Sequence, residues 1–220
     1  MAPSTAVTAK PGGATDGAEP VLYRLLRPAA RAVLDRWFDL RVEGVEHVPD
    51  RGPYIVAANH HNYLDGVVLA VAAPRAIRFL VMPRVWRATP LHPLLHRGIG
   101  SIPLSLARPD VGALRAALAE LARGRVIGIF PEGPFSVRGR LEPGLPGVAL
   151  LAVRSGVPVV PAGIRGTYEA LAGRRFHVPR RHPLAVRFGR PRAFGGAGAG
   201  REARRRVTER IMADIAALLA

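Results

Sequence analysis

A cluster of polar and ionisable side chains follows directly after an apolar segment, in the run from Asn59 to Gly66. Its two acid–base residues, His60 and Asp65, are five positions apart, which on an ideal helix places them about 140° from each other. They can meet only if His60 lies in a loop and Asp65 in the first turn of the next helix. In that geometry the carboxylate keeps one imidazole nitrogen protonated, and the other nitrogen is free to take a proton from a hydroxyl group. The structural alternative is that Asn59, Asn62 or Asp65 caps the helix and His60 is merely hydrogen-bonded.

A second candidate lies after the apolar run 125–130, where Pro131, Glu132 and Gly133 follow one another. The proline fixes the direction of the backbone, and the glycine leaves little bulk around the carboxylate. Glu132 is therefore either part of a site or a turn residue that holds the loop.

A third segment, residues 157–166, is apolar and contains Pro158 and Pro161. Because proline removes a hydrogen bond from a strand ladder, these residues predict an irregular or edge strand. On its own this segment indicates only packing.

Taken together and in this order, the three segments resemble the motifs of the phospholipid and glycerol acyltransferase family, whose best-known members acylate lysophosphatidic acid. The similarity extends over about residues 41–194. In that family a histidine deprotonates the acceptor hydroxyl, which attacks the thioester of acyl-CoA or acyl-carrier protein, and an aspartate orients the histidine. The resemblance implies that His60 is the general base and that Asp65 orients it.

The resemblance implies further site residues and both substrates. Glu132 and Gly133 are expected in the acceptor site, and Asn59, Pro131 and Ser136, in or beside the motifs, are expected to bind substrate. The implied partners are a lipid acceptor and acyl-CoA or acyl-carrier protein as co-substrate. No metal and no bound cofactor is expected, because the thioester itself carries the driving force.

The chain departs from the family pattern at three positions where that pattern has a basic residue: Leu106, Phe135 and Leu145. In the family those cations are thought to hold the phosphate of the acceptor, a task for which the arginine fork is well suited. Their absence predicts a different acceptor, such as a lyso-aminolipid, a glycolipid or another hydroxylated lipid. Three nearby arginines are the alternative phosphate ligands: Arg108, Arg138 and Arg140.

The elements around these residues predict an α/β fold. Short apolar runs rich in β-branched residues predict strands at 54–58, 77–81, 126–130, 157–160 and 184–188. Helical periodicity predicts helices at 64–73, 111–123, 148–154 and about 202–219. This alternation indicates a single domain with a largely parallel mixed sheet flanked by helices. Four prolines between residues 84 and 109 predict a loop-rich segment that lines a site.

An amphipathic basic helix is predicted at residues 21–40, before the core. Its apolar stripe consists of Leu22, Leu25, Leu26, Ala29, Val33, Trp37 and Phe38. Such a helix either caps the core or lies in a membrane interface with its arginines at the head groups. No apolar stretch is long enough to span a bilayer, since Pro74, Arg75 and Arg78 interrupt the best candidate. We therefore expect peripheral contact with an anionic membrane, in the cytoplasm on the inner face of the cell membrane.

The expected organisation has four parts: a disordered leader (1–20), the basic helix (21–40), an acyltransferase core (41–194), and a basic linker with a C-terminal helix (195–220). The 32 lysines and arginines exceed the 16 acidic residues and give a net charge of +16. Because Lys10 is the only lysine, base composition explains this excess as well as an anionic partner does. The arginine-rich C-terminal third is either a solvated face or a patch for anionic membranes.

Several other chemistries are disfavoured. The chain has no cysteine, which excludes disulfides, thiolate metal sites and a cysteine nucleophile. His92 and His96 have metal-ligand spacing, but Pro93 lies between them and no acidic partner follows. The serines at 101, 105 and 136 lie outside any Gly-x-Ser-x-Gly elbow.

Two rival functions remain beside the acyltransferase. One is a non-catalytic basic module for nucleic acid or anionic lipid, although nucleic acid is not expected because the chain lacks a helix-turn-helix, RNA-binding aromatic pair or zinc motif. The other is a thioesterase-like hydrolase, in which water alone consumes the thioester.

Overall fold

The computed structural model describes residues 19–105, 110–136, 138–171, 179–198 and 200–220. Residues 1–18, most of the expected leader, lie outside this part of the chain. In chain order the elements are α1 (Val21–Phe38), β1 (Arg41–Glu43), the 3-10 helix η1 (Val45–His47), β2 (Tyr54–Ala58), α2 (Leu64–Ala72), β3 (Ile77–Val81), α3 (Pro83–Trp86), α4 (His92–Gly98), β4 (Ile102–Pro103), α5 (Val111–Ala122), β5 (Val126–Ile129), α6 (Gly147–Ser155), β6 (Val159–Arg165), α7 (Thr167–Leu171), β7 (Ala185–Phe188) and α8 (Arg201–Leu219).

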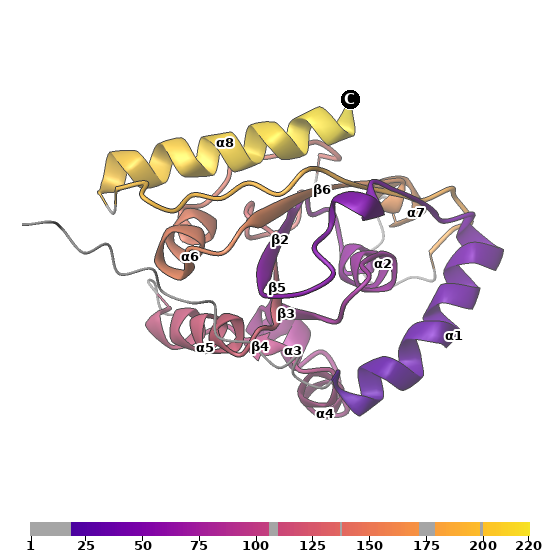
Figure 1. Ribbon diagram of the computed structural model, residues 1–220. Coiled ribbons are helices and arrows are strands. Elements are labelled where there is room, and N and C mark those ends of the chain that lie inside the picture. The colour runs from indigo at the N-terminus through magenta and orange to yellow at the C-terminus, as the bar shows by residue number, and fades with distance from the viewer. Residues whose placement is uncertain (1–18, 106–109, 137, 172–178, 199) are drawn as a thin grey trace, which may run out of the picture.

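The described strands form one seven-stranded sheet in the order β1-β7-β6-β2-β5-β3-β4 (Figure 1). Neighbouring strands are parallel except for β6 and β7, which are antiparallel. Because β2, β5 and β3 are adjacent and parallel, their carboxyl ends lie at the same edge of the sheet. The predicted α/β fold class, with a largely parallel mixed sheet, is confirmed.

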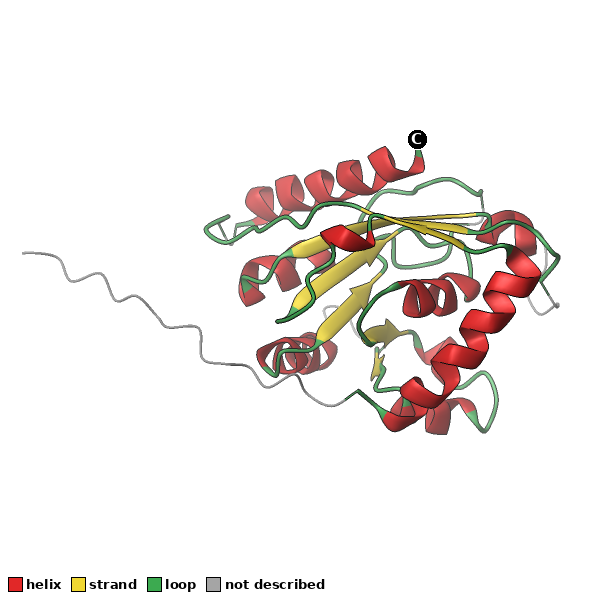
Figure 2. Cartoon of the chain, turned by 45° about the vertical axis from the view of Figure 1, so that its right-hand side comes forward, coloured by secondary structure: helices red, strands yellow, loops and turns green. Residues whose placement is uncertain are grey.

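Helices cover both faces of the sheet (Figure 2). Side chains of α1, α2 and α7 share one core cluster, and side chains of α5, α6 and α8 share the other. Strand β2 supplies both clusters by alternation: Tyr54, Val56 and Ala58 face the first, and Ile55 and Ala57 face the second. All five residues are fully buried, so β2 is fixed from both sides just before the polar run that follows it.

Strand β6 is irregular at Pro161, as expected, because its ladder with β7 is interrupted there, but it is not an edge strand. It runs to Arg165 and lies inside the sheet, between β7 and β2. Pro161 is tolerated there because it lies between two paired residues of β6. Ala162 pairs with Phe188 of β7, and Val159 forms an isolated bridge with Arg192. Its carbonyl still accepts a hydrogen bond of 2.8 Å from the Gly189 N–H.

The segment expected to be loop-rich, residues 84–109, contains most of α3, all of α4 and strand β4. Two of its prolines lie inside these elements: Pro93 stands in the first turn of α4, where a missing N–H costs nothing, and Pro103 lies in β4. The short elements β1 and α7 are also absent from the expectations drawn from the sequence.

Helix α1 buries only part of the predicted stripe. Phe38 of the stripe is buried, together with Tyr23 and Leu34 from outside it, whereas Leu25, Leu26, Val33 and Trp37 of the stripe are exposed. Polar contacts with α2 select the buried face. The Tyr23 hydroxyl donates to the carbonyl of Ala70 at 2.9 Å, and the Arg27 guanidinium donates to carbonyls at the end of α2, those of Val71, Ala73 and Pro74.

Helix α8 is part of the core, because Val207, Ile211 and Ile215 are buried against the sheet. Many of its arginines are paired on the helix itself or with a neighbour: Arg205 with Glu202 and Glu209, Arg206 with Glu202, and Arg210 and Arg192 with Asp214. Pairing therefore leaves fewer unpaired cations on α8 than its arginine content indicates. Among the described helices, none has the length and apolarity that crossing a bilayer requires.

Candidate active site

The structure brings His60 and Asp65 together in the arrangement that their spacing required. His60 follows the carboxyl end of β2, and Asp65 is the second residue of α2. The Nδ1 atom of His60 lies 2.9 Å from Oδ2 of Asp65. Since a carboxylate only accepts, Nδ1 carries the proton and Nε2 is left as the basic nitrogen.

Asp65 is held firmly in this position. It is fully buried, and its Oδ2 also accepts the backbone N–H groups of His61 at 2.6 Å and Asn62 at 2.7 Å. Backbone N–H groups at the start of a helix hold a carboxylate oxygen in a fixed place. The Oδ1 atom has no partner among the described residues. Asp65 thus fixes both the loop after β2 and the tautomer of His60.

Two phenylalanines fix the plane of the imidazole. Phe130 stacks on the His60 ring with centroids 3.8 Å apart, and Phe135 meets it edge-on at 4.6 Å. Phe79 of β3 stacks in turn on Phe130 at 5.9 Å. Within the described residues no hydrogen bond engages Nε2 of His60. The sequence reasoning missed these phenylalanines; the available signal was that aromatic residues flank the Pro131–Gly133 turn on both sides.

Glu132 links the loop of the base to a second loop. Its Oε1 accepts the backbone N–H of His60 at 2.7 Å, and its Oε2 accepts that of Glu142, also at 2.7 Å. Burial raises the pKa of Glu132, and the two backbone hydrogen bonds oppose that shift. Because both oxygens serve the backbone, Glu132 positions His60.

The residues on either side of Glu132 form a tight turn. Gly133 has φ +80°, and a Cβ atom there would lie 2.7 Å from Cδ1 of Leu145, so only glycine fits. The carbonyl of Pro131 accepts the Leu145 N–H at 2.7 Å. This turn brings the loop around Leu145 next to the base.

Asn59 and Ser136, which were expected to bind substrate, form hydrogen bonds with the backbone. Asn59 is fully buried, and its amide accepts from the N–H of Ile164 at 2.7 Å and donates to the carbonyl of Ile164 at 2.8 Å. Ser136 is also buried; its N–H donates to the carbonyl of His60 at 2.8 Å and its hydroxyl to that of Arg140 at 2.6 Å. Both side chains are engaged by the backbone and have no free surface for a substrate.

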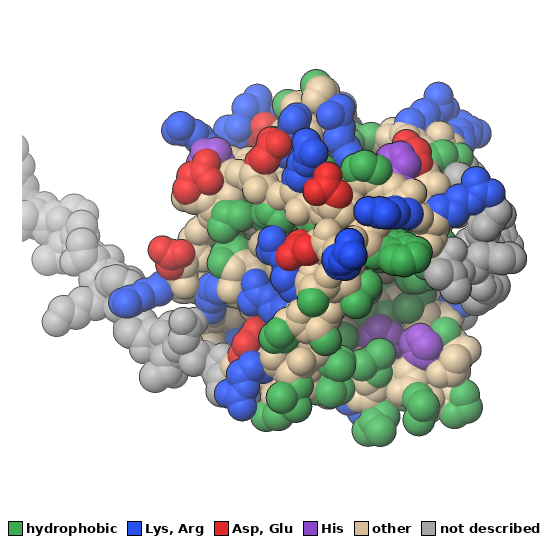
Figure 3. Space-filling view, turned by 90° about the vertical axis from the view of Figure 1, so that its right-hand side faces the viewer, with side chains coloured by type: hydrophobic (Ala, Val, Ile, Leu, Met, Phe, Trp, Pro, Cys, Tyr) green, Lys and Arg blue, Asp and Glu red, His purple; other side chains and the backbone are tan. Residues whose placement is uncertain are grey.

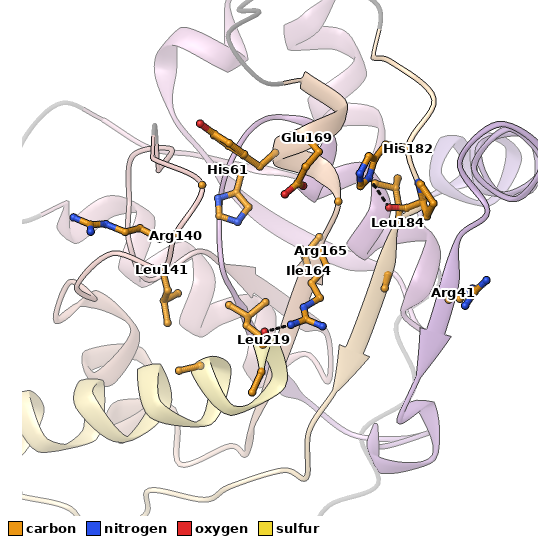
Figure 4. Close-up of a pocket in the computed structure, with 17 residues that line it drawn as sticks. Arg41, His61, Arg140, Leu141, Ile164, Arg165, Glu169, His182, Leu184 and Leu219 are labelled. Atoms are coloured by element: carbon orange, nitrogen blue, oxygen red, sulfur yellow. Dashed lines mark hydrogen bonds between the residues drawn. The ribbon is translucent and has the colours of Figure 1, made fainter.

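His61 points away from the base, towards a pocket of about 800 Å³ at the ends of β6 and β7 (Figure 4). The Asn59 amide donates to Nε2 of His61, which leaves the proton of the neutral ring on Nδ1. Burial lowers the pKa of His61, so the ring is neutral at pH 7. Arg165, Glu169 and His182 line the pocket, whereas His60 does not.

The positions of the missing phosphate ligands are only partly described. Leu106 and Arg108 lie outside the described residues. Phe135 and Leu145 are each 41% exposed, which leaves uncharged side chains on the surface beside the base. Arg138 and Arg140 are exposed on the same loop, and Arg140 lies 3.8 Å from the Glu142 carboxylate.

Comparison with known proteins shows the family of this chain. The sequence model of the family described as Acyltransferase matches residues 39–165. The chain belongs to the acyltransferase family. The matched region contains His60, Asp65, Glu132 and strands β2 to β6.

Relatives within this family are distant. An uncharacterized protein of Mycobacterium tuberculosis is 31% identical over 160 residues, covering 66% of this chain and 42% of the relative. A chloroplastic 1-acyl-sn-glycerol-3-phosphate acyltransferase of Brassica napus is 28% identical over 129 residues, covering 57% of this chain and 37% of the relative. The chain thus spans about two-fifths of the length of these relatives.

The fold is that of a solved acyltransferase structure. The crystal structure of the 1-acyl-sn-glycerophosphate acyltransferase from Thermotoga maritima matches with a TM-score of 0.72 at 24% sequence identity. The match covers 90% of this chain and 81% of the other. At this identity the match supports the fold alone.

Proposed function

We propose that this chain is an O-acyltransferase that moves a fatty acyl group from acyl-CoA or acyl-carrier protein to a hydroxyl group of a lipid acceptor. The observation that carries the proposal is the buried His60–Asp65 pair, with Nε2 of His60 left free at the carboxyl edge of the sheet. Family membership supports the same reaction class. The 1-acyl-sn-glycerol-3-phosphate acyltransferases among its relatives support a lipid acceptor.

The reaction follows from the protonation states of the pair. Nε2 of His60 takes the proton of the acceptor hydroxyl while its oxygen attacks the thioester carbonyl carbon. The C–O bond forms, the C–S bond breaks, and the imidazolium returns its proton to the departing thiolate. Asp65 stabilises the imidazolium between these steps. The thioester supplies the driving force, so the proposal includes no metal and no redox cofactor.

The test is acyl transfer by the purified protein. A labelled palmitoyl thioester is offered on coenzyme A and on acyl-carrier protein, with and without a panel of lyso-lipids, and the thiol and the lipid products are measured separately. Acceptor-dependent formation of an acylated lipid supports the proposal. Thiol release that does not need an acceptor indicates the hydrolase instead, and absence of both products indicates a non-catalytic module.

Lysophosphatidic acid is expected to be a poorer acceptor than an uncharged or zwitterionic lyso-lipid. Phe135 and Leu145 stand where the family has cations, and each lost charge-assisted hydrogen bond is worth about 1.5–3 kcal/mol. We expect kcat/KM to be lower for lysophosphatidic acid by about tenfold or more. Phe135→Arg should narrow that difference, whereas Val45→Arg, on an exposed site elsewhere, should not. Preference of the unmodified protein for lysophosphatidic acid would show that Arg108, Arg138 or Arg140 holds the phosphate.

The proposed membrane partner is the anionic cytoplasmic face of the cell membrane, which the protein contacts peripherally. The exposed face of α1 carries Leu25, Leu26, Val33 and Trp37 together with arginines. The protein is therefore expected to sediment with anionic vesicles and to be released only in part as salt rises, because salt screens the arginines but not the apolar contacts. Leu25→Glu should weaken sedimentation without unfolding, since Leu25 lies outside the core. Binding that ignores both lipid charge and salt would contradict this expectation.

A further inference from the structure

The segment from Met82 to Ser105, which carries α3 and α4, has an unusual composition. It contains three arginines, two histidines and no acidic residue. Two of its leucines are strongly exposed: Leu91 is 72% exposed and Leu94 is 69% exposed. Exposed leucines grouped on one short segment are uncommon on a soluble surface and indicate an interaction site.

This segment starts at the edge of the sheet that carries the base. It follows the carboxyl end of β3, and β3 is adjacent and parallel to β5, whose end leads to Glu132. The stack of Phe79, Phe130 and His60 connects β3 to the base directly. The end of β3 that leads into α3 therefore lies at the same edge of the sheet as the base.

Helix α1 extends the same surface. Leu22 packs against Gly98 of α4, where an added Cβ atom would lie 2.7 Å from Cδ2 of Leu22. Three large apolar side chains in the first turns of α1 are exposed: Val21, Leu25 and Leu26. The space-filling view shows apolar side chains gathered over the lower part of this face, with histidines in a hollow among them (Figure 3).

The charges on this surface are unpaired cations. Arg24, Arg84, Arg87 and Arg97 are exposed, and none forms an ion pair with another described residue. The arginines of α8 differ, because most of them face acidic partners on the same helix. Leucines ringed by unpaired arginines match an anionic bilayer, which offers apolar chains below a layer of negative head groups.

We infer that α3 and α4, together with the first turns of α1, form the surface that docks on an anionic bilayer. In this orientation the sheet edge with His60 faces the lipid, and the acceptor hydroxyl reaches the base without leaving the head-group layer. The arginines of α8 do not contribute to this docking. The inference deepens the proposed function and rests on it, because the proposed function is what makes a membrane lipid the acceptor.

The two tryptophans of the chain provide a direct test. Trp37 lies on α1 and Trp86 on α3, so Trp37→Phe leaves Trp86 as the only reporter. The full chain with this substitution is mixed with vesicles of phosphatidylcholine and phosphatidylglycerol that contain lipids brominated along the acyl chains. We expect quenching of Trp86 fluorescence that grows with the fraction of phosphatidylglycerol. Vesicle binding without any quenching of Trp86 would overturn the inference, as would absence of vesicle binding.

Matched variants test the leucines themselves. Leu91→Glu and Leu94→Glu are each expected to lower vesicle affinity about tenfold, because an apolar contact is lost and a negative charge is added. Val45→Glu is the control, since Val45 is exposed but lies in η1, next to the carboxyl end of β7 and hence at the opposite edge of the sheet. Equal losses in the three variants would contradict the inference. A thermal unfolding curve for each variant shows that the fold is retained.

Activity separates this inference from the proposed function. Leu94→Glu should lower transfer to a vesicle-embedded acceptor and leave transfer to a soluble short-chain acceptor unchanged. Quenching of Trp86 without acyl transfer to any acceptor leaves the docking surface in place and overturns the proposed function. Acyl transfer without quenching of Trp86 overturns the docking surface and leaves the proposed function in place. Loss of vesicle affinity in Arg204→Ala equal to that in Arg84→Ala would show that the C-terminal arginines do contribute.

Discussion

His60→Ala is expected to lower the rate of acyl transfer by about 10²–10⁴-fold, the usual contribution of a general base. The reason is that Asp65 holds the proton on Nδ1 of His60 and leaves Nε2 as the base. Without the imidazole, no group takes the proton of the acceptor hydroxyl. The measurement is kcat with saturating thioester and the preferred acceptor.

The control for His60→Ala is His61→Ala, which removes the neighbouring imidazole that faces the pocket instead of the base. Thermal unfolding of both variants tests whether the fold is retained. Turnover of His60→Ala close to that of the unmodified protein would show that the base has been assigned wrongly.

Asp65→Asn is expected to cause a loss of similar size, about 10²–10⁴-fold, with the imidazole still present. An asparagine amide also presents donors to His60 and to the backbone N–H groups of His61 and Asn62, so it disturbs both the tautomer and the loop. A loss of kcat at all pH values, with little change in KM for the acceptor, is the expected result. An unchanged kcat would mean that Asp65 serves only the helix start.

The second large effect is expected for Glu132→Ala. The variant leaves the backbone N–H groups of His60 and Glu142 without their buried acceptor, and each unpaired group costs about 1–3 kcal/mol. We expect the free energy of unfolding to fall by about 2–5 kcal/mol and kcat to fall as well, because the loop that holds the base is released. Urea unfolding and steady-state kinetics measure the two effects.

Glu142→Ala is the matched control for Glu132→Ala. It removes a carboxylate from the same pair of loops but keeps the backbone N–H that Glu132 accepts, since only the Glu142 side chain changes. Its effect on stability is expected to be below about 1 kcal/mol, as for other surface ion pairs. Equal losses for the two variants would show that Glu132 does not position His60 through the backbone.

The His60–Asp65 pair could be predicted from the sequence because it depends only on nearby residues. His60 and Asp65 are five residues apart, and only one backbone arrangement lets them meet: a loop that leads into a helix. The predicted strands at 54–58 and 77–81 are confirmed as β2 and β3. Strand β2 is fully buried, and its run of apolar residues shows this in the sequence, whereas β3 is buried only at its two ends.

The roles of Asn59, Glu132 and Ser136 depended on contacts between distant parts of the chain. Asn59 bonds to Ile164, which is 105 residues away, and Glu132 bonds to His60, which is 72 residues away. A polar residue in a motif looks the same in the sequence whether it faces a substrate or the backbone of another loop. Only the tertiary structure showed that these side chains hold the site together.

The amphipathic character of α1 was evident from the sequence, but its orientation was not. Most of the predicted stripe, including Leu25 and Trp37, is exposed, whereas Phe38 of that stripe is buried together with Tyr23 and Leu34. The choice between the faces was made by α2, through hydrogen bonds from Tyr23 and Arg27 to its last carbonyl groups. Periodicity determines that a helix is amphipathic, whereas the partner that it packs against determines which face is buried.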